Sequence, residues 1–181
     1  MNVMYGMKTT MEKHAKGKWI VVSLVLLLPF LFLMKRVEGD YLDGRFGYNS
    51  NDAYELIDHL GDVGQKSYLD FLGLDDGIIL FFSIVLLLVM GVLSKKLKLG
   101  DKWAFIYALP LLRATCDLFE NVLITILLYK YPSRLDAVAD LSGLATGLKW
   151  IFMMTTIALI ACLSCMVLWK AISRKKTIGS H

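Results

Sequence analysis

The chain has 181 residues, of which 56% are hydrophobic, and a formal net charge of +4. This apolar fraction lies above the roughly 45–50% that is usual in soluble domains, and the mean hydropathy of +0.56 agrees with it, which excludes an ordinary soluble domain. The basic residues gather in a few short segments that membrane topology and anionic lipid headgroups explain, so nucleic acid is not expected as a partner.

Four apolar stretches predict four transmembrane helices, at residues 19–34, 77–93, 103–129 and 150–169. A spanning helix needs about 20 mainly apolar residues. The last two stretches reach this length, and the first two are extended by flanking residues such as Lys18 and Lys35, whose long side chains reach the interface. The sequence therefore predicts one membrane domain, at 19–170.

A basic segment, residues 1–18, precedes the first stretch, as it does in a secretory signal peptide. No small-x-small cleavage pattern follows residues 19–34, so we interpret that stretch as an uncleaved anchor. Pro29 lies inside it and is expected to kink the helix, which spanning helices tolerate.

The connection between the first two stretches, residues 35–76, holds ten acidic and four basic residues. Apolar residues at helical spacing over 53–60 predict an amphipathic helix. Ser50 or Asn51 can cap its start, and Gly61 can cap its end.

Residues 62–73 predict a second, weaker amphipathic helix. Together the two helices predict a short helical cap on the outer side, which either covers the end of the bundle or docks an external partner or a lipid headgroup. His59 has no second histidine near it in the sequence, so we expect no metal site there.

Lysine and arginine in short loops predict the orientation of membrane helices. The N-terminal segment, the connection 94–103 and a tail at 171–181 are rich in them, whereas the connection before the last stretch holds only Arg134 and Lys149. We therefore expect a multi-pass protein of the bacterial cytoplasmic (inner) membrane, with both termini cytoplasmic and residues 35–76 outside.

The third stretch carries four polar residues at helical spacing, Arg113, Asp117, Glu120 and Asn121. Residues three and four positions apart lie on one face of a helix. Charged groups at membrane depth are costly and normally face a bundle interior or a wet cavity. We therefore expect this face to point at the other helices and Arg113 to pair with one carboxylate.

Two interpretations of this polar face stay open. In the first, an Arg–Asp pair and amide hydrogen bonds only fix how the helices pack. In the second, the face lines a cavity in which Glu120 binds a proton or a cation. The one carboxylate in excess on this helix keeps the second interpretation open, and Pro110, one turn before Arg113, is expected to open the backbone locally.

Cys162 and Cys165 form a C-x-x-C motif, which is the spacing of thiol–disulfide enzymes. The predicted orientation places them in the cytoplasmic half of the last helix, where disulfide exchange is not expected. We interpret both, together with Cys116, as small buried packing residues.

Signals for catalysis are few. The chain has no glycine-rich phosphate loop, no H-E-x-x-H and no G-x-S-x-G, and we expect no catalytic residues, no cofactor and no metal. Gly143 and Gly147 form a small-xxx-small pair, which predicts close approach of another helix, within the bundle or between protomers.

Two motifs carry a resemblance to a family of uncharacterised bacterial four-helix integral membrane proteins. The family has an outer L-G-x-x-G-[RQ]-x-x-Y-L segment and a D-[LF]-x-E-N segment in its third helix, and the similarity covers roughly residues 40–132. The matching positions are Leu60, Gly61, Gly64, Gln65, Tyr68 and Leu69, then Asp117, Leu118, Glu120 and Asn121. The resemblance implies the same topology but no activity, and Gln65, in place of the basic residue expected there, weakens any role for that position.

The sequence thus predicts an all-α membrane protein, with four transmembrane helices in a bundle and a short amphipathic helical cap outside. The first functional hypothesis is a non-catalytic membrane component, and an enzyme is the less favoured class. The alternatives are a small transporter or ion-coupled protein that uses Glu120 and Asp117, and a membrane enzyme that acts on a lipid. The partners expected are the lipid bilayer and either a second copy of the chain or another membrane protein.

Overall fold

The structure is a computed structural model that describes residues 2–35, 37 and 39–178. Residues 1, 36, 38 and 179–181 belong to the predicted N-terminal segment, outer connection and tail, and they lie outside the described residues.

Every element of regular structure among the described residues is a helix, which confirms the all-α fold. The elements in chain order are α1 (Asn2–His14), α2 (Gly17–Met34), the short 3-10 helix η1 (Leu42–Gly44), α3 (Ser50–Leu97), the 3-10 helix η2 (Asp101–Tyr107), α4 (Ala108–Lys130) and α5 (Asp136–Ile178).

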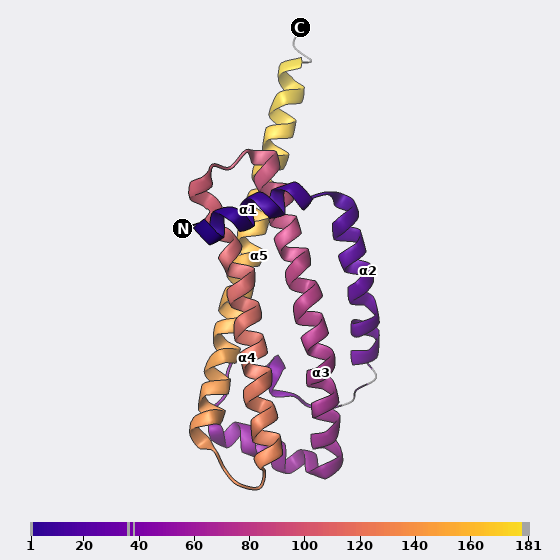
Figure 1. Cartoon of the computed structure of the whole chain (residues 1–181), viewed down its shortest axis with the longest axis vertical. Helices are drawn as coiled ribbons and strands as arrows, with labels where there is room; N and C mark the ends of the chain where they lie inside the picture. Colours follow the sequence, from indigo (N-terminus) through magenta and orange to yellow (C-terminus); the bar gives the residue numbers. More distant parts are fainter. Residues whose placement is uncertain (1, 36, 38, 179–181) are drawn as a thin grey trace.

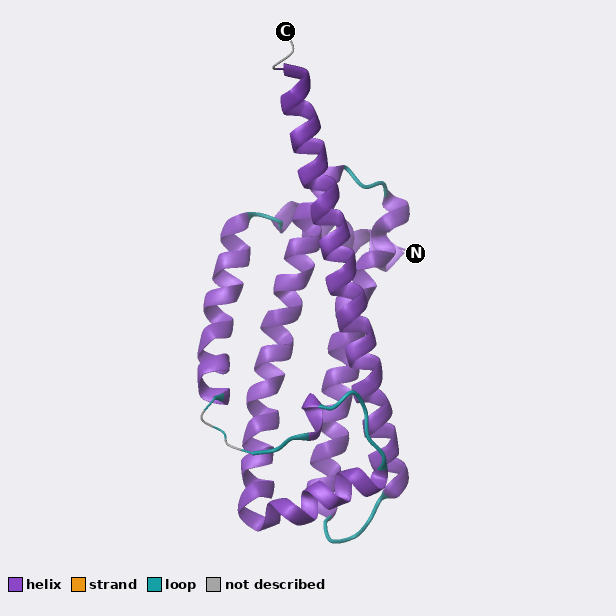
Figure 2. Cartoon of the chain, turned by 180° about the vertical axis from the view of Figure 1, so that it is seen from behind, coloured by secondary structure: helices purple, strands orange, loops and turns teal. Residues whose placement is uncertain are grey.

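The long helices α2, α3, α4 and α5 run side by side along the long axis of the molecule, as Figure 1 shows. Helix α3 packs against α2, α4 and α5, and α4 packs against α5. The two ends of the molecule differ in what they carry. We call the upper end in Figure 1, with α1, η2 and the last turns of α5, the terminal end. The lower end, with η1, the start of α3 and residues 131–135, is the loop end; Figure 2 shows its loops from behind.

Helix α3 begins with a capping box. The Asn49 side chain accepts hydrogen bonds from the backbone N–H groups of Asn51 and Asp52, and the Asp52 carboxylate accepts one from Asn49 N–H. The start of the helix is therefore close to the prediction, although the cap is Asn49 and not Ser50 or Asn51.

Gly61 ends the first segment of α3, as predicted. Its φ of +59° and ψ of −175° interrupt the helical backbone, and a positive φ favours glycine. The segment before it lies across the loop end of the molecule in Figure 1, and the rest of α3 runs along the bundle.

The second predicted short helix, at residues 62–73, is not a separate element. These residues continue without interruption into the apolar part of α3, and Tyr68, Phe71 and Leu72 are buried in the apolar core of the loop end. The expectation of two short helices was therefore wrong for the second one. Gly64 and Gly73 both stay helical, so nothing in this stretch stops the helix.

Helix α2 packs on α3 at a glycine. A Cβ at Gly77 would lie 2.1 Å from the nearest ring carbon of Phe30, whose ring centroid is 5.6 Å from that of Phe81. A larger residue at this position would require the Phe30 ring to move. The two helices are antiparallel, and Met34, the last residue of α2, lies one turn beyond Phe30. Helix α2 therefore ends at a level about one turn before Gly77 on α3.

The third predicted stretch, 103–129, is helical throughout but has two parts. Residues up to Tyr107 belong to η2, and α4 begins at Ala108. Pro110 therefore lies in the first turn of α4, where its missing N–H removes no helical hydrogen bond. The helix therefore accommodates this proline without the local opening of the backbone that was expected.

Helix α5 is much longer than the predicted 150–169. It starts at Asp136, so the residues that the sequence analysis assigned to a loop form its first four turns. Gly143 and Gly147 lie within it and do not break it.

Most of the predicted basic N-terminal segment forms the helix α1. This helix packs on α3 and η2 at the terminal end. The buried Lys8 ammonium lies 2.9 Å from an Asp101 carboxylate oxygen, and Ser94 donates a hydrogen bond of 2.6 Å to Glu12. A Cβ at Gly91 would lie 3.0 Å from Met11 O, so the glycine allows α1 to pack closely on α3.

Among the described residues, three helices are long and apolar enough to cross a membrane: α2, α3 and, over residues 136–173, α5. Helix α4 has the length, at 23 residues. Its three central charges, Arg113, Asp117 and Glu120, set it apart from the other three, so its placement depends on how these charges are buried.

Two apolar cores lie at opposite ends of the bundle. The core of the loop end is built from η1, both segments of α3, α4 and α5, and includes Leu42, Ile57 and Leu127. The core of the terminal end includes Met90, Tyr107 and Leu163, with the methionines of α1 packed against it. The polar residues of α4 lie between these two cores.

A candidate functional site: a buried ion network

The four predicted polar residues share one buried face of α4. Their exposed fractions are 7% for Arg113, 1% for Asp117, 0% for Glu120 and 4% for Asn121. Arg113 and Asp117 form an ion pair one helical turn apart, as predicted, and the guanidinium lies 5.6 Å from the ring centre of Phe82 on α3. The expectation that this face points at the other helices is confirmed.

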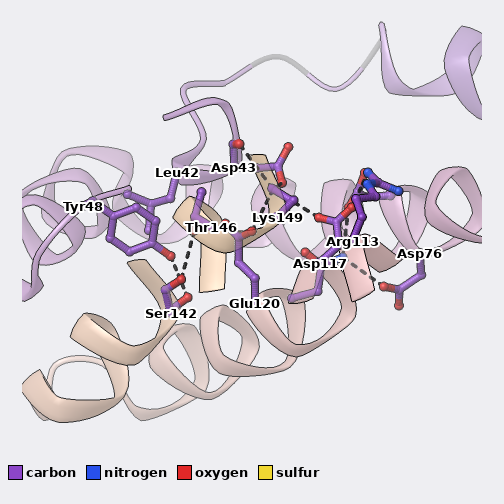
Figure 3. A network of polar contacts seen from close by, with 12 residues as sticks. Leu42, Asp43, Tyr48, Asp76, Arg113, Asp117, Glu120, Ser142, Thr146 and Lys149 are labelled. Atoms are coloured by element: carbon purple, nitrogen blue, oxygen red, sulfur yellow. Dashed lines mark hydrogen bonds and ion pairs between the residues drawn. The ribbon is translucent and has the colours of Figure 1, made fainter. Parts of the chain in front are cut away.

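A lysine that the sequence analysis assigned to a loop lies at the centre of the network. Lys149 projects from α5, and its ammonium lies 3.1 Å from an Asp117 oxygen and 2.7 Å from a Glu120 oxygen. It also pairs with Asp43, and Figure 3 shows all three carboxylates around it. Lys149 is only 4% exposed.

Asp43 reaches this site from η1, which the protein holds in place through the preceding residue. Leu42 is completely buried in the core of the loop end, and its backbone N–H donates a hydrogen bond of 2.9 Å to the Tyr68 hydroxyl. The carboxylate of Asp43 therefore points from the connection between α2 and α3 onto α5. Asp43 was not among the candidate residues expected from the sequence.

Asn121 connects α4 to α3. Its amide nitrogen donates hydrogen bonds to Asp75, at 3.0 Å, and to Asp76, at 2.9 Å. Asp75 is buried, at 5% exposed. The network thus joins four elements: η1, α3, α4 and α5.

The charge balance differs from the one expected from α4 alone. Lys149 supplies the cation that the extra carboxylate of α4 lacked, but Asp43 adds a further carboxylate. Arg113 and Lys149 therefore face three carboxylates directly, and Asn121 holds two more, Asp75 and Asp76. The described network still has more carboxylates than cations.

Three of the carboxylates are close enough together for a cation to bridge them. Oxygens of Asp43, Asp75 and Asp117 lie within 4.8 Å of one another. The Lys149 ammonium contacts two of these three groups, Asp43 and Asp117. The ammonium therefore already pairs with two of the three carboxylates that a bound cation would contact.

A small cavity of about 80 Å³ lies beside the network, lined by Asp43, Arg113, Lys149, Trp150 and Met153. Among the described residues, the buried Nε and Nη1 of Arg113 and Nε1 of Trp150 have no hydrogen-bond partner. All three are donors, and buried donors normally find an acceptor. The cavity gives water or another small acceptor a route to the guanidinium.

A loop, and not another helix, packs against the glycine pair of α5. A Cβ at Gly143 would lie 1.9 Å from the backbone oxygen of Tyr48, and one at Gly147 would lie 3.7 Å from that of Phe46. The Tyr48 hydroxyl lies 2.6 Å from the Ser142 hydroxyl, and burial raises the pKa of Tyr48, which keeps the phenol protonated. The prediction of close helix approach at this pair was wrong.

The cysteines differ from their prediction as well. Cys162 and Cys165 are free and lie exposed on α5, and Cys116 is half-buried. The interpretation of the pair as buried packing residues was therefore wrong, since these side chains face outward with the other exposed apolar residues of α5. His59 is exposed on the first segment of α3.

Comparison of the chain with protein-family models, with curated proteins and with solved structures finds no match. The resemblance of the two motifs to a bacterial membrane family stays a prediction.

Proposed function

We propose that the chain is an integral membrane protein of the bacterial cytoplasmic membrane, with four spanning helices, α2 to α5. The support is the apolar surface of the described helices. In the most apolar part of α2 and of α5, only 11% of the residues are buried within the chain. Exposed leucine, valine and isoleucine side chains cover both helices. So large an exposed apolar surface needs a lipid environment or a partner.

The burial of its charges allows α4 to be the fourth span. Arg113, Asp117 and Glu120 all face the interior of the bundle, whereas the outward side chains of α4 include Leu118, Phe119 and Val122, all exposed and apolar. This is the arrangement expected of charged residues in a spanning helix.

The charged residues at the two ends of the molecule suggest which end faces the cytoplasm. The terminal end carries the lysine-rich segments, and the loop end carries the acidic connection between α2 and α3. The positive-inside rule then places the terminal end and both chain termini in the cytoplasm, and the loop end, with the first segment of α3 as a helical cap, outside.

In this orientation the outer part of the ion network, where Asn121 contacts Asp75, lies near the outer boundary of the hydrocarbon, whereas Arg113, beside Phe82 of α3, lies deeper. Helix α2 ends at Met34, which packs against the core of the loop end. Asp75, which Asn121 joins to α4, stands within about a turn of this level on α3. The cost of burying Asp75 is lower here than at the bilayer centre, and the deeper Arg113 is paired with Asp117.

We infer that the protein is a non-catalytic membrane component whose ion network locks the outer connection onto the bundle. One observation carries this inference: Lys149 of α5 reaches carboxylates on both η1 and α4. Its ammonium is held by groups of the chain itself, so it is not free to serve as an acid or base for a substrate.

The proposed orientation predicts the labelling of single cysteines. In a chain with Cys116, Cys162 and Cys165 replaced by alanine, Val63→Cys at the loop end, where Val63 is 83% exposed, should react with an impermeant maleimide in intact cells. Lys98→Cys at the terminal end should react only after permeabilisation. Labelling of Lys98→Cys in intact cells would reverse the orientation, and labelling of both would contradict the membrane topology.

A second candidate function is favoured by the cavity of about 80 Å³ and by the surplus of carboxylates. An ion-coupled protein would need an acidic group that is reachable by water and able to bind a proton or a cation. Asp43 lines the cavity, and Glu120 would be reached from it only past Lys149, whose ammonium lies 2.7 Å from a Glu120 oxygen. This candidate and the structural one differ in what Glu120 must do.

Glu120→Gln separates the two candidates. The amide oxygen can still accept a hydrogen bond from Lys149, so for a structural role we expect a stability loss of about 1–2 kcal/mol and no other effect. The measurement is thermal unfolding in detergent across pH and sodium concentration. If unfolding of the wild type depends on sodium or on pH near neutrality, and Glu120→Gln removes that dependence, the ion-coupled function is the correct one.

A further inference from the structure

A second cavity lies at the terminal end, between α3 and α5. It has a volume of about 270 Å³ and is lined by Lys96, Val167, Lys170 and Ala171. The two lysines come from different helices, and none of the described residues that line the cavity is acidic. Among the described residues, no ion pair joins Lys96 or Lys170 to an acidic group.

The lining combines charge and apolar surface. Val167 and Ala171 are one turn apart on α5 and form an apolar wall, and Lys96 and Lys170 line the same cavity. Two cations without an anion between them repel each other, and an anion placed there would offset the repulsion. A lining of this kind suits a molecule that has an anionic group and an apolar part.

The level of the cavity in the proposed membrane points to the same molecule. Lys96 follows the apolar part of α3 and Lys170 directly follows the apolar part of α5. Trp169, which is 76% exposed, precedes Lys170, and tryptophan is enriched where spanning helices meet the interface. Both lysines therefore stand at the level of lipid headgroups on the cytoplasmic side.

A lysine at the end of α3 has a simpler explanation, because cations are favourable at a helix C-terminus. Lys95 stands in the same last turn and serves the same end without lining the cavity. The dipole of α3 therefore accounts for a basic last turn. It does not account for a second lysine, Lys170, that lines the same cavity from the other helix.

We propose that this cavity binds the headgroup of an anionic phospholipid of the cytoplasmic leaflet. Lys96 and Lys170 donate hydrogen bonds to its phosphate oxygens, and Val167 and Ala171 contact its glycerol backbone. A zwitterionic headgroup brings its own cation, which the two ammonium groups repel, so an anionic lipid is preferred. This inference rests on the membrane placement proposed above.

The test is native mass spectrometry of the full chain, released from vesicles that hold equal amounts of phosphatidylglycerol and phosphatidylcholine. The wild type should retain phosphatidylglycerol in preference. Lys96→Gln/Lys170→Gln should lower this preference by about fivefold for each lysine removed. The matched control is Lys98→Gln/Lys102→Gln, which removes the same charge from the neighbouring connection, outside the cavity, and should keep the preference.

Two outcomes would overturn the inference. An equal loss in both double variants would mean that bulk electrostatics, and not the cavity, selects the lipid. Binding of inorganic phosphate that depends on Lys96 and Lys170, without any preference between the two lipids, would mean an anion site and not a lipid site. Extraction of each variant with alkaline carbonate keeps the questions apart: a chain that leaves the membrane contradicts the proposed function, whereas an embedded chain without lipid preference contradicts only this inference.

Discussion

Replacing Lys149 by methionine is expected to lower the free energy of unfolding by about 3–5 kcal/mol, which is the cost of removing one partner from a buried ion network. Methionine has a similar length and fills the same space in α5, so the loss would come from the charge. Three carboxylates, Asp43, Asp117 and Glu120, would be left with Arg113 as their only cation among the described network. Denaturation in mixed micelles would measure the effect.

The control for this change is Lys130→Met, which removes an exposed lysine from the last turn of α4 and should cost less than about 1 kcal/mol. The rescue is Lys149→Met combined with Asp43→Asn and Glu120→Gln, which leaves Asp117, paired with Arg113, as the only charged group of the three that Lys149 contacts. Balanced replacement of buried ions is often neutral, so this variant should recover most of the lost stability. Equal stability of Lys149→Met and Lys130→Met would contradict the central role of Lys149.

Gly143→Ala is expected to destabilise the chain by about 1–3 kcal/mol, the usual cost of overpacking, less what alanine gains as a better helix former. The new methyl group would meet the backbone of Tyr48 at 1.9 Å, and backbone cannot rotate away as a side chain can. The loop must therefore shift, and with it the Tyr48–Ser142 contact and Asp43, five residues earlier. Hydrogen exchange of residues 42–48 would report this shift.

Gly147→Ala is the matched control, one turn further along α5. A Cβ there would lie 3.7 Å from Phe46 O, which is an ordinary contact. The helix gains from alanine without a clash, so we expect a stabilisation of about 0.5–1 kcal/mol. The two substitutions are chemically identical and should have opposite signs. The same sign for both would mean that the loop does not pack on α5 as described.

The sequence predicts the helical fold well because its apolar stretches are long and few. It also predicts the buried face of α4, since Arg113, Asp117 and Glu120 are spaced by three and four residues inside an apolar helix. This spacing alone accounts for the Arg113–Asp117 pair. Local periodicity was enough for this contact because both residues belong to one helix.

The partners of that face were missed because they come from other elements. Lys149 stands just before an apolar stretch, so it was assigned to the connection and not to the first turns of α5. A signal was present: Ser142, Thr146 and Lys149 are spaced by four and three residues, which is a polar stripe on one face of a helix. Asp43 offered no such signal, because its position depends on Leu42 and Tyr68, which lie 26 residues apart.

The cap was predicted in part for a similar reason. Gly61 adopts a positive φ and Gly64 and Gly73 do not, and the sequence does not distinguish between them. The burial of Tyr68 and Phe71 against the other helices decides that the second segment continues into α3. Tertiary packing, and not local propensity, sets this boundary.

The charged groups of the ion network are also synthesised in a fixed order. A chain is made from its N-terminus, so Asp43 and the acidic face of α4 exist before Lys149 does. Until α5 follows, α4 carries two carboxylates and one guanidinium, which makes it a poor candidate to stay in lipid alone. Helices α4 and α5 are therefore expected to leave the insertion machinery as a pair, with the last helix supplying the charge that lets its predecessor settle. The Lys149 ammonium group, which is synthesised after the other charged groups of the network, would thus complete the insertion of this protein.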